Sequence, residues 1–297
     1  MKGTWFWTGV WLLLEWGTIL GGGLFLFTFV LFCKNAHPPR HPSLYPEAPS
    51  IPLEEVTFQT TDGIVLRGSF SFRDSKRPTI VLCHGVGANQ TDLYPFAQVL
   101  YEKGGFNVFS FDFRAHGQSA GRLTSYGAHE QRDLEAALTF LDETPLRRDY
   151  GFMGVSMGAS VGILVAARDV RLKAVWVDSP FIDLTEAIKI YLKTFYHLPE
   201  FPFLPLALLS YRLLFHKPPE EVSPIKVVDQ ISPRPLMVVN GLLDDRMQPK
   251  LTQKLYEKAK EPKSLWLIPL AGHLEGHLLE PQSYNERLLT FFSSLAK

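Results

Sequence analysis

Strand-like and helix-like segments alternate along most of this chain of 297 residues, and the alternation limits its fold more than any other feature. Short apolar runs typical of buried strands occur at 79–85, 107–113, 149–154, 173–180, 234–241 and 264–272. Segments with helix-like patterns occur at 93–103, 129–141, 159–168, 250–260 and 282–296. Two further strands are predicted within 54–72, on either side of an Asp62-Gly63 turn. This alternation predicts an α/β fold with a mainly parallel central sheet and helices on both faces.

The segment 181–232 interrupts the alternation. It lies between two predicted strands, it is apolar, aromatic and interrupted by prolines, and it is far longer than a simple crossover requires. We predict that it forms two or three short helices. A long insertion in a compact domain is usually functional, and a cap over a pocket is one interpretation. An ordinary place in the helix layer of the core is the other, and the sequence leaves both open.

The N-terminal segment 1–34 has the most distinctive composition. Residues 16–33 form an uncharged run of 18, which as a helix spans about 27 Å, close to the thickness of a bilayer's hydrocarbon core. We therefore predict a retained signal anchor, so that the chain is a single-pass membrane protein. A cleaved signal peptide is the alternative, but the run is long for one and no A-x-A cleavage site follows it. Charges flank both ends of the run, so they do not select the side of the membrane on which the rest of the chain lies.

The composition bounds the rest of the chain. The stretch 35–52 contains six prolines and no apolar periodicity, which predicts an extended linker before a folded domain at 53–297. Positive and negative charges balance at 30 each, so nucleic-acid binding has no electrostatic basis. The two cysteines, Cys33 and Cys83, cannot form a disulfide framework. Neither belongs to a Cys/His cluster, and no metal site is predicted.

The sequence GVSMG at 154–158 fits the pattern G-x-S-x-G. A predicted strand leads into it and a predicted helix of small residues follows, which is the context of a nucleophile on a tight turn. The glycines allow the turn to close around the serine. The start of the helix presents backbone N–H groups toward developing negative charge. Ser156 is therefore the predicted nucleophile.

A serine hydroxyl needs a base, and the base needs an acid to orient it. Two histidines follow the last predicted strand, and we favour His273, on a glycine-flanked loop directly past that strand, over His277. Asp244 and Asp245 follow the preceding strand, and the spacing from the glycine that ends the strand favours Asp244. Asp178, at the end of an earlier strand, is a third candidate for the acid. The carboxyl ends of parallel strands share one edge of a sheet, so these side chains are expected to lie near Ser156.

An oxyanion in this site would need two hydrogen-bond donors. Met157, the residue after the nucleophile, is expected to supply one backbone N–H. The loop HGVGAN at 84–89 follows an early strand, and Val86 is the predicted source of the second. His84 precedes the serine at a strand end, and we expect it to shape the loop rather than to act as the base.

The chain resembles the α/β-hydrolase superfamily over about 53–297. The motifs that carry the resemblance are His84-Gly85, Asp112-x-Arg114-x-His116-Gly117-x-Ser119, Gly154-x-Ser156-x-Gly158 and the pair Asp244 and His273. In the second motif, Ala115 replaces the usual glycine. In the family this stretch is mainly structural, which implies that Arg114 and His116 lie outside the triad. The run Asp244-Asp245-Arg246 also resembles the acid loop of prolyl-oligopeptidase-type members, which supports the first aspartate as the acid.

The resemblance and the residues together predict a membrane-anchored serine hydrolase that cleaves carboxylic esters through an acyl-enzyme, without a metal or organic cofactor. The apolar insertion and the anchor favour a lipid-like substrate with a hydrophobic acyl group. Several leucines are expected to line a pocket, to touch a bilayer or to belong to the core: Leu204, Leu206, Leu208, Leu209, Leu213 and Leu214. An aminopeptidase- or thioesterase-type enzyme and a non-catalytic, membrane-tethered binding module remain alternatives. No feature indicates an oligomeric state.

Overall fold

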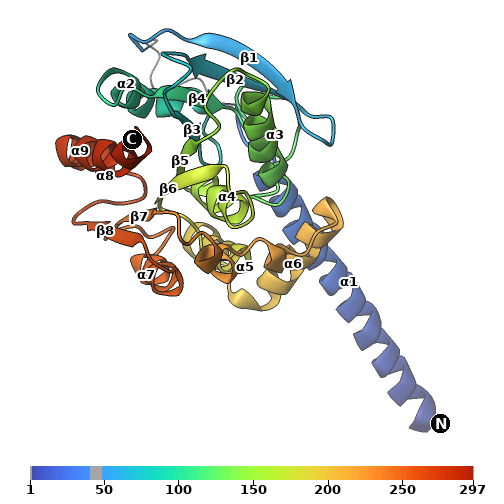
Figure 1. Cartoon of the computed structure of the whole chain (residues 1–297). Helices are drawn as coiled ribbons and strands as arrows, with labels where there is room; N and C mark the ends of the chain where they lie inside the picture. The colour runs from blue at the N-terminus through green and yellow to red at the C-terminus, as the bar shows by residue number, and fades with distance from the viewer. Residues whose placement is uncertain (1, 41–48, 297) are drawn as a thin grey trace.

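The computed structural model describes residues 2–40 and 49–296. An eight-stranded sheet crosses the described domain in the order β1-β2-β4-β3-β5-β6-β7-β8 (Figure 1). The pairs β1–β2 and β2–β4 are antiparallel, and the others are parallel, which confirms the predicted mostly parallel sheet. The strands are β1 (Glu54–Gln59), β2 (Val65–Ser71), β3 (Thr79–Cys83), β4 (Asn107–Phe111), β5 (Tyr150–Val155), β6 (Leu172–Asp178), β7 (Leu236–Gly241) and β8 (Lys263–Ile268).

Helices cover both faces of the sheet, as the α/β pattern predicts. One face packs against α2 (Tyr94–Glu102) and α9 (Pro281–Phe292), with the short α8 (Gly276–Leu279) leading into α9. The other face packs against α3 (Glu130–Asp142), α4 (Met157–Ala166) and α7 (Pro249–Lys258). Side chains of a strand alternate between two faces, so β3, which is buried throughout, sends Val81 to one cluster and Ile80 to the other.

The insertion after β6 forms α5 (Leu184–Tyr196) and α6 (Glu200–Phe215), followed by three short 3₁₀ turns at Pro219–Glu221, Pro224–Lys226 and Val228–Gln230. Helix α6 lies beside the N-terminal helix, and α5 packs against α6 (Figure 1). The leucines of α6 are divided among several environments. Leu204 is buried, Leu206, Leu208 and Leu214 are half-buried, and Leu209 and Leu213 are exposed.

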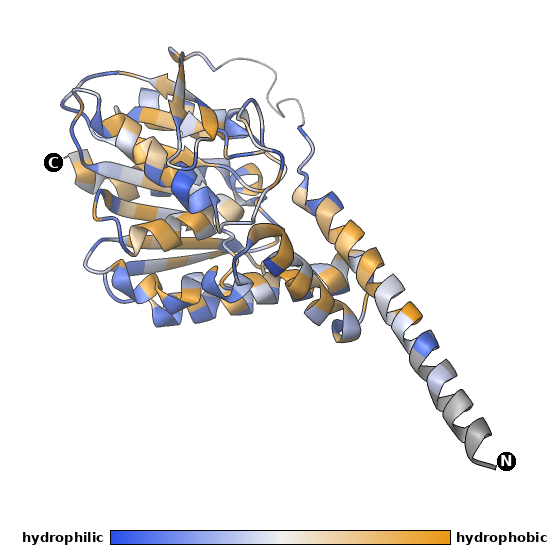
Figure 2. Cartoon of the chain, turned by 90° about the vertical axis from the view of Figure 1, so that its right-hand side faces the viewer, coloured by the Kyte–Doolittle hydropathy of each residue, from blue (hydrophilic) through white to orange (hydrophobic). Residues whose placement is uncertain are grey.

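The N-terminal helix α1 (Lys2–Ala36) projects away from the domain, and its last turns pack against α6 (Figures 1 and 2). Its segment Glu15–Ala36 is the part of the described chain that is long and apolar enough, by length and composition, to cross a membrane. The helix runs two residues into the stretch expected to be a linker. Of that linker, residues 41–48 lie outside the described chain.

Candidate active site

Ser156 lies on the turn between β5 and α4, at the carboxyl edge of the sheet. Its backbone is left-handed, with φ 51° and ψ −117°, a conformation that few residues other than glycine adopt. The neighbouring glycines are required by close packing. A Cβ at Gly154 would approach the Ala159 nitrogen to 2.7 Å, and one at Gly158 would overlap the Cys83 carbonyl oxygen. The sequence GVSMG therefore holds the serine hydroxyl above the edge of the sheet.

The structure brings Ser156, His273 and Asp244 together from three loops. His273 Nε2 lies 3.1 Å from Ser156 Oγ, and His273 Nδ1 lies 2.8 Å from Asp244 Oδ2. Asp244 is buried, and its Oδ1 accepts backbone hydrogen bonds from Arg246 at 3.0 Å and Met247 at 2.7 Å. Because these bonds fix the carboxylate, its second oxygen remains directed at the imidazole. Each preferred member of the predicted set is thus within hydrogen-bond distance of the next.

The other candidates for the base and the acid have different surroundings. Asp245 is exposed. Asp178 is buried, which raises its pKa, and it accepts hydrogen bonds from the Tyr284 hydroxyl at 2.7 Å and the Ser179 hydroxyl at 2.9 Å. Burial lowers the pKa of His277, whose ring packs against Phe96 with 5.1 Å between ring centroids.

The predicted oxyanion donors, Val86 and Met157, line the same cavity as Ser156. The Ser156 N–H donates to the Asp178 carbonyl at 2.8 Å, so it is already engaged. Met157 is the first residue of α4, where backbone N–H groups have no partner within the helix. A Cβ at Gly85 would lie 3.1 Å from that of Ser156, so the loop that carries Val86 runs close to the nucleophile.

His84 shapes this loop, as expected. The Phe113 N–H donates to His84 Nε2 at 3.0 Å, which leaves the proton on Nδ1, and Nδ1 donates to the Gly85 carbonyl at 2.7 Å. Burial lowers the pKa of His84 to about 4. The imidazole is therefore neutral near pH 7, and both its nitrogens are occupied.

The motif that begins at Asp112 joins two loops. Asp112 Oδ1 accepts the Gln90 N–H at 2.7 Å and Oδ2 accepts the Gln118 N–H at 2.8 Å. The Arg114 guanidinium forms salt bridges with both Asp62 and Asp133. Ala115, which replaces a glycine of the resembled motif, has a left-handed φ of 66°. These contacts support the loops around the site and leave the motif outside the Ser156–His273–Asp244 set.

The Met157 side chain is buried directly beneath the site. Its sulfur lies 3.5 Å from the Thr124 hydroxyl oxygen, and that hydroxyl donates to the buried Glu130 at 2.9 Å. Glu130 also accepts the backbone N–H of Ser125 and Gly127, each at 2.8 Å. Glu130 therefore fixes the loop on which the Met157 side chain packs, a role that no motif in the sequence indicates.

A cavity of about 460 Å³ opens beside Ser156. Ser156 and His273 line it together with Arg246 and Glu275, but most of its wall is apolar. Helices α1 and α5 supply part of this apolar wall, and α6 adds one residue to it: the six are Leu31, Phe32, Leu184, Ile188, Leu192 and Ala207. An apolar hollow with few polar groups converging at one end is typical of a small-molecule site.

The contribution of α1 to this wall was missed by sequence reasoning. Thr28, Leu31, Phe32 and Asn35 line the cavity, whereas the apolar composition of α1 indicated only a bilayer. One signal was available. Polar side chains within an apolar helix tend to face protein rather than lipid, and Thr28 and Asn35 lie on the same helix face.

Comparisons with known proteins agree with this fold. The sequence model described as the alpha/beta hydrolase family matches residues 80–287. The uncharacterized protein YqkD of Bacillus subtilis is 32% identical over 220 residues, which cover 73% of this chain and 72% of the relative. The thiohydrolase aneE of Aspergillus aculeatus is 32% identical over 135 residues, 44% of this chain and 42% of that protein. The solved structure of the Pyrococcus furiosus esterase Pf2001 has a TM-score of 0.72 at 26% identity, covering 88% of this chain and 100% of the esterase.

Proposed function

Since the chain belongs to the α/β-hydrolase family, we propose that it is a membrane-anchored serine hydrolase that cleaves carboxylic esters with a hydrophobic acyl group. The observation that carries the proposal is the continuous hydrogen-bonded arrangement of Ser156, His273 and Asp244 at one end of an apolar cavity. A buried acid, an imidazole and a serine in this order are the parts that acyl transfer requires.

The proposed reaction proceeds in two halves. Asp244 accepts a hydrogen bond from the Nδ1–H of His273, so Nε2 carries no proton and takes the proton of Ser156 as Oγ attacks the carbonyl carbon. The backbone N–H groups of Val86 and Met157 stabilise the oxyanion of the tetrahedral intermediate. His273 then returns the proton to the leaving alcohol, and the acyl group stays on Ser156. Water, activated by the same imidazole, releases the acid in the second half.

Two features support the proposed substrate class and the proposed membrane anchor. The apolar wall of the cavity favours a hydrophobic acyl group over a charged one, because a charge there would lose its hydration without a partner. The segment Glu15–Ala36 of α1 has the length and composition of a membrane span. The structural similarity to the esterase Pf2001 is consistent with ester cleavage by this chain.

Thioester cleavage is the second candidate, and the partial likeness to the thiohydrolase aneE favours it. A thioester passes through the same tetrahedral geometry, so the same residues would act on it. Two further alternatives are an aminopeptidase-type activity and a binding module without catalysis. The following assay distinguishes them from ester cleavage.

The test uses the full chain in detergent with 4-nitrophenyl esters of graded acyl length, matched thioesters and aminoacyl arylamides. We expect ester cleavage that improves with acyl length, and we expect Ser156→Ala to lower kcat by about a thousandfold or more. Ser160→Ala is the matched control, because Ser160 lies one turn further along α4 and its hydroxyl donates to the Phe181 carbonyl at 2.9 Å. A folded protein that cleaves none of these substrates would favour a binding module, and preferred arylamide cleavage would favour an aminopeptidase.

A further inference from the structure

We propose that the C-terminal end of α1 forms part of the wall of the cavity that binds the acyl chain, and that the acyl chain enters this cavity from the bilayer. The proposal rests on the hydrolase function and the membrane anchor proposed above. It assigns α1 a part in substrate binding, in addition to its part as an anchor.

One face of α1 lies in the cavity that reaches the nucleophile. Thr28, Leu31, Phe32 and Asn35 recur at intervals of three, one and three residues, so they share a helix face, and all four line the cavity with Ser156. Val30 is 57% exposed and does not line it. The helix therefore has a pocket-facing side and an outward side within the same two turns.

Specific contacts fix this part of α1 against the domain. The Phe32 ring packs edge-on against Tyr126, Tyr211 and Phe215, with ring centroids 6.0 to 6.3 Å away. The Tyr196 hydroxyl of α5 donates to Asn35 Oδ1 at 2.7 Å. A wall held by both aromatic packing and a side-chain hydrogen bond has a defined position relative to Ser156.

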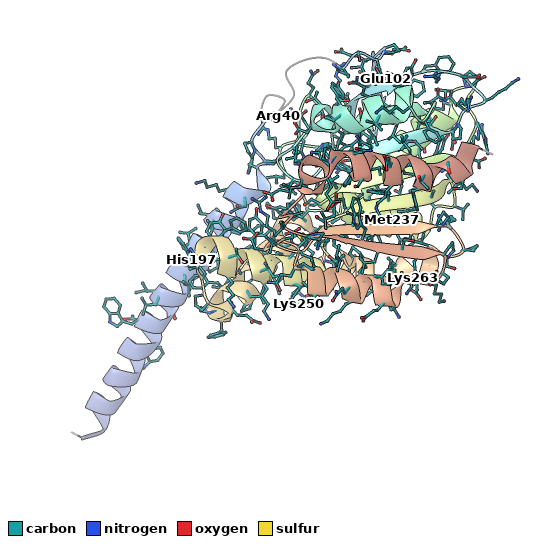
Figure 3. All side chains as sticks on the ribbon, turned by 90° about the vertical axis from the view of Figure 1, so that its left-hand side faces the viewer. Arg40, Glu102, His197, Met237, Lys250 and Lys263 are labelled. Atoms are coloured by element: carbon teal, nitrogen blue, oxygen red, sulfur yellow. The ribbon has the colours of Figure 1, made fainter. Side chains whose placement is uncertain are left out.

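Further hydrogen bonds extend the docking beyond the end of the helix. The Thr124 N–H donates to the Ala36 carbonyl at 2.9 Å. The Arg40 guanidinium donates to the carbonyl oxygens of Gly117, Ser119 and Gly121 at 2.5, 2.8 and 3.2 Å. Figure 3 shows Arg40 where the chain leaves α1 beside the domain. The guanidinium thus ties this exit to the end of the Asp112 motif and to the residues directly after it.

The pocket-lining residues belong to the proposed span itself. The 22 residues of Glu15–Ala36 extend about 33 Å as a helix, close to the roughly 30 Å of a hydrocarbon core. With the span in a bilayer, Thr28 to Asn35 lie in its C-terminal half, within about 12 Å of one membrane surface. The cavity wall that they form is then at the depth of the acyl chains.

Helix α6 continues the outward apolar surface of α1. The Phe203 ring of α6 lies 6.4 Å from the Phe27 ring of α1. Three large apolar side chains of α6 face outward: Phe201 is 81% exposed, Leu209 43% and Leu213 53%. In Figure 2, α6 lies beside the hydrophobic part of α1. We infer that these exposed apolar side chains of α6 touch the membrane interface, so that lipid lies next to the pocket wall.

The first test changes the wall and compares acyl lengths. Leu31→Trp adds bulk to the pocket-facing side of α1, and Val30→Trp is the matched control on the outward side. We expect Leu31→Trp to lower the ratio of kcat/KM for a palmitoyl ester to that for a butyryl ester by at least about tenfold, because the added ring occupies space that the longer acyl chain needs. Val30→Trp should leave this ratio unchanged. Equal ratios in the two variants would overturn the proposal.

The second test examines delivery from the membrane. A 4-nitrophenyl palmitate substrate is placed in phosphatidylcholine vesicles, and soluble 4-nitrophenyl butyrate serves as the reference. Leu209→Glu with Leu213→Glu should lower the vesicle-to-soluble rate ratio severalfold, because carboxylates disfavour contact with the interface. The matched control is Phe72→Glu with Val170→Glu, two exposed apolar residues outside α1 and α6. A ratio that falls equally in both pairs, or in neither, would contradict entry from the bilayer.

The outcomes separate this proposal from the function on which it rests. One outcome is that butyryl ester cleavage requires Ser156 but the rate ratios of the α1 and α6 variants are unchanged. This outcome would contradict the role of α1 in substrate binding and would leave the proposed hydrolase function intact. If the unsubstituted, folded chain cleaved no ester, the proposed hydrolase function itself would be wrong.

Discussion

Asp244 and Asp245 are neighbours in sequence but lie in different environments. Asp244 is buried against His273 and receives two backbone hydrogen bonds, whereas Asp245 is exposed. We expect Asp244→Asn to lower kcat by about a thousandfold or more, because the amide no longer holds the imidazole in the tautomer that accepts the serine proton. Asp245→Asn should change kcat by less than about threefold. Comparable losses in the two variants, measured on one ester, would contradict Asp244 as the acid.

His84 is a residue whose burial predicts a dependence of stability on pH. Its pKa is about 4 in the folded chain and about 6.5 when exposed, because burial disfavours the imidazolium. Between these values the unfolded chain binds a proton at His84 and the folded chain does not. The unfolding free energy should therefore fall as the pH drops from about 6.5 to about 4, by at most about 1.4 kcal/mol per pH unit.

His84→Gln removes this contribution, so denaturant unfolding of the two proteins across that pH range measures it. The difference in unfolding free energy, unsubstituted chain minus variant, should decrease by about 3 kcal/mol between pH 6.5 and pH 4. Parallel curves for the two proteins would show that His84 does not stay neutral in the folded chain.

At the scale of elements, Gly158 allows α4 to pack against the end of β3. A Cβ there would overlap the Cys83 carbonyl oxygen and lie 2.6 Å from that of His84. We expect Gly158→Ala to lower the unfolding free energy by about 1–3 kcal/mol, because the backbone must move to admit the methyl group. Gly21→Ala is the control, since an added Cβ there meets no atom of the described chain within 4 Å. Thermal unfolding in detergent measures both, and an unchanged midpoint for Gly158→Ala would refute the close contact.

Most element positions could be predicted because local periodicity reflects burial. The strand expected at 149–154 is β5 at Tyr150–Val155, and the helix expected at 129–141 is α3 at Glu130–Asp142. Differences arise where the site bends the chain. The strand expected at 264–272 ends at Ile268, because the following residues turn to bring His273 to Ser156, with Leu270 at a φ of 60°. Periodicity carries no information on such turns.

The candidate site could be predicted in part for the same reason. Ser156, His273 and Asp244 follow strand ends whose positions are visible in the sequence. The docking of α1 could not be predicted, because apolar composition alone does not distinguish a helix face that meets lipid from one that meets α5 and α6. The partner of Asp178 was also hidden, since Tyr284 is 106 residues away in the chain.

At the scale of the whole molecule, α1 is expected to remain in the mature protein. Its last turns contribute Phe32 and Ala36 to the buried core, so removal of the helix would expose that core. Intact-mass measurement of the membrane-extracted protein should therefore give a chain that retains the residues of α1, and alkaline carbonate should fail to release it. A mature chain that begins after Ala36 would contradict both the anchor and the pocket wall.

The proposed function depends above all on Ser156 being the nucleophile of an acyl-transfer site. A fluorophosphonate reacts with an activated serine by displacement of fluoride, so the adduct marks the nucleophile itself. The direct measurement is mass-spectrometric location of the adduct on the full chain in detergent, with Ser156→Ala and Ser160→Ala in parallel. We predict one adduct, on Ser156, that disappears in Ser156→Ala and persists in Ser160→Ala. An adduct on another residue, or no adduct on the folded protein, would contradict it.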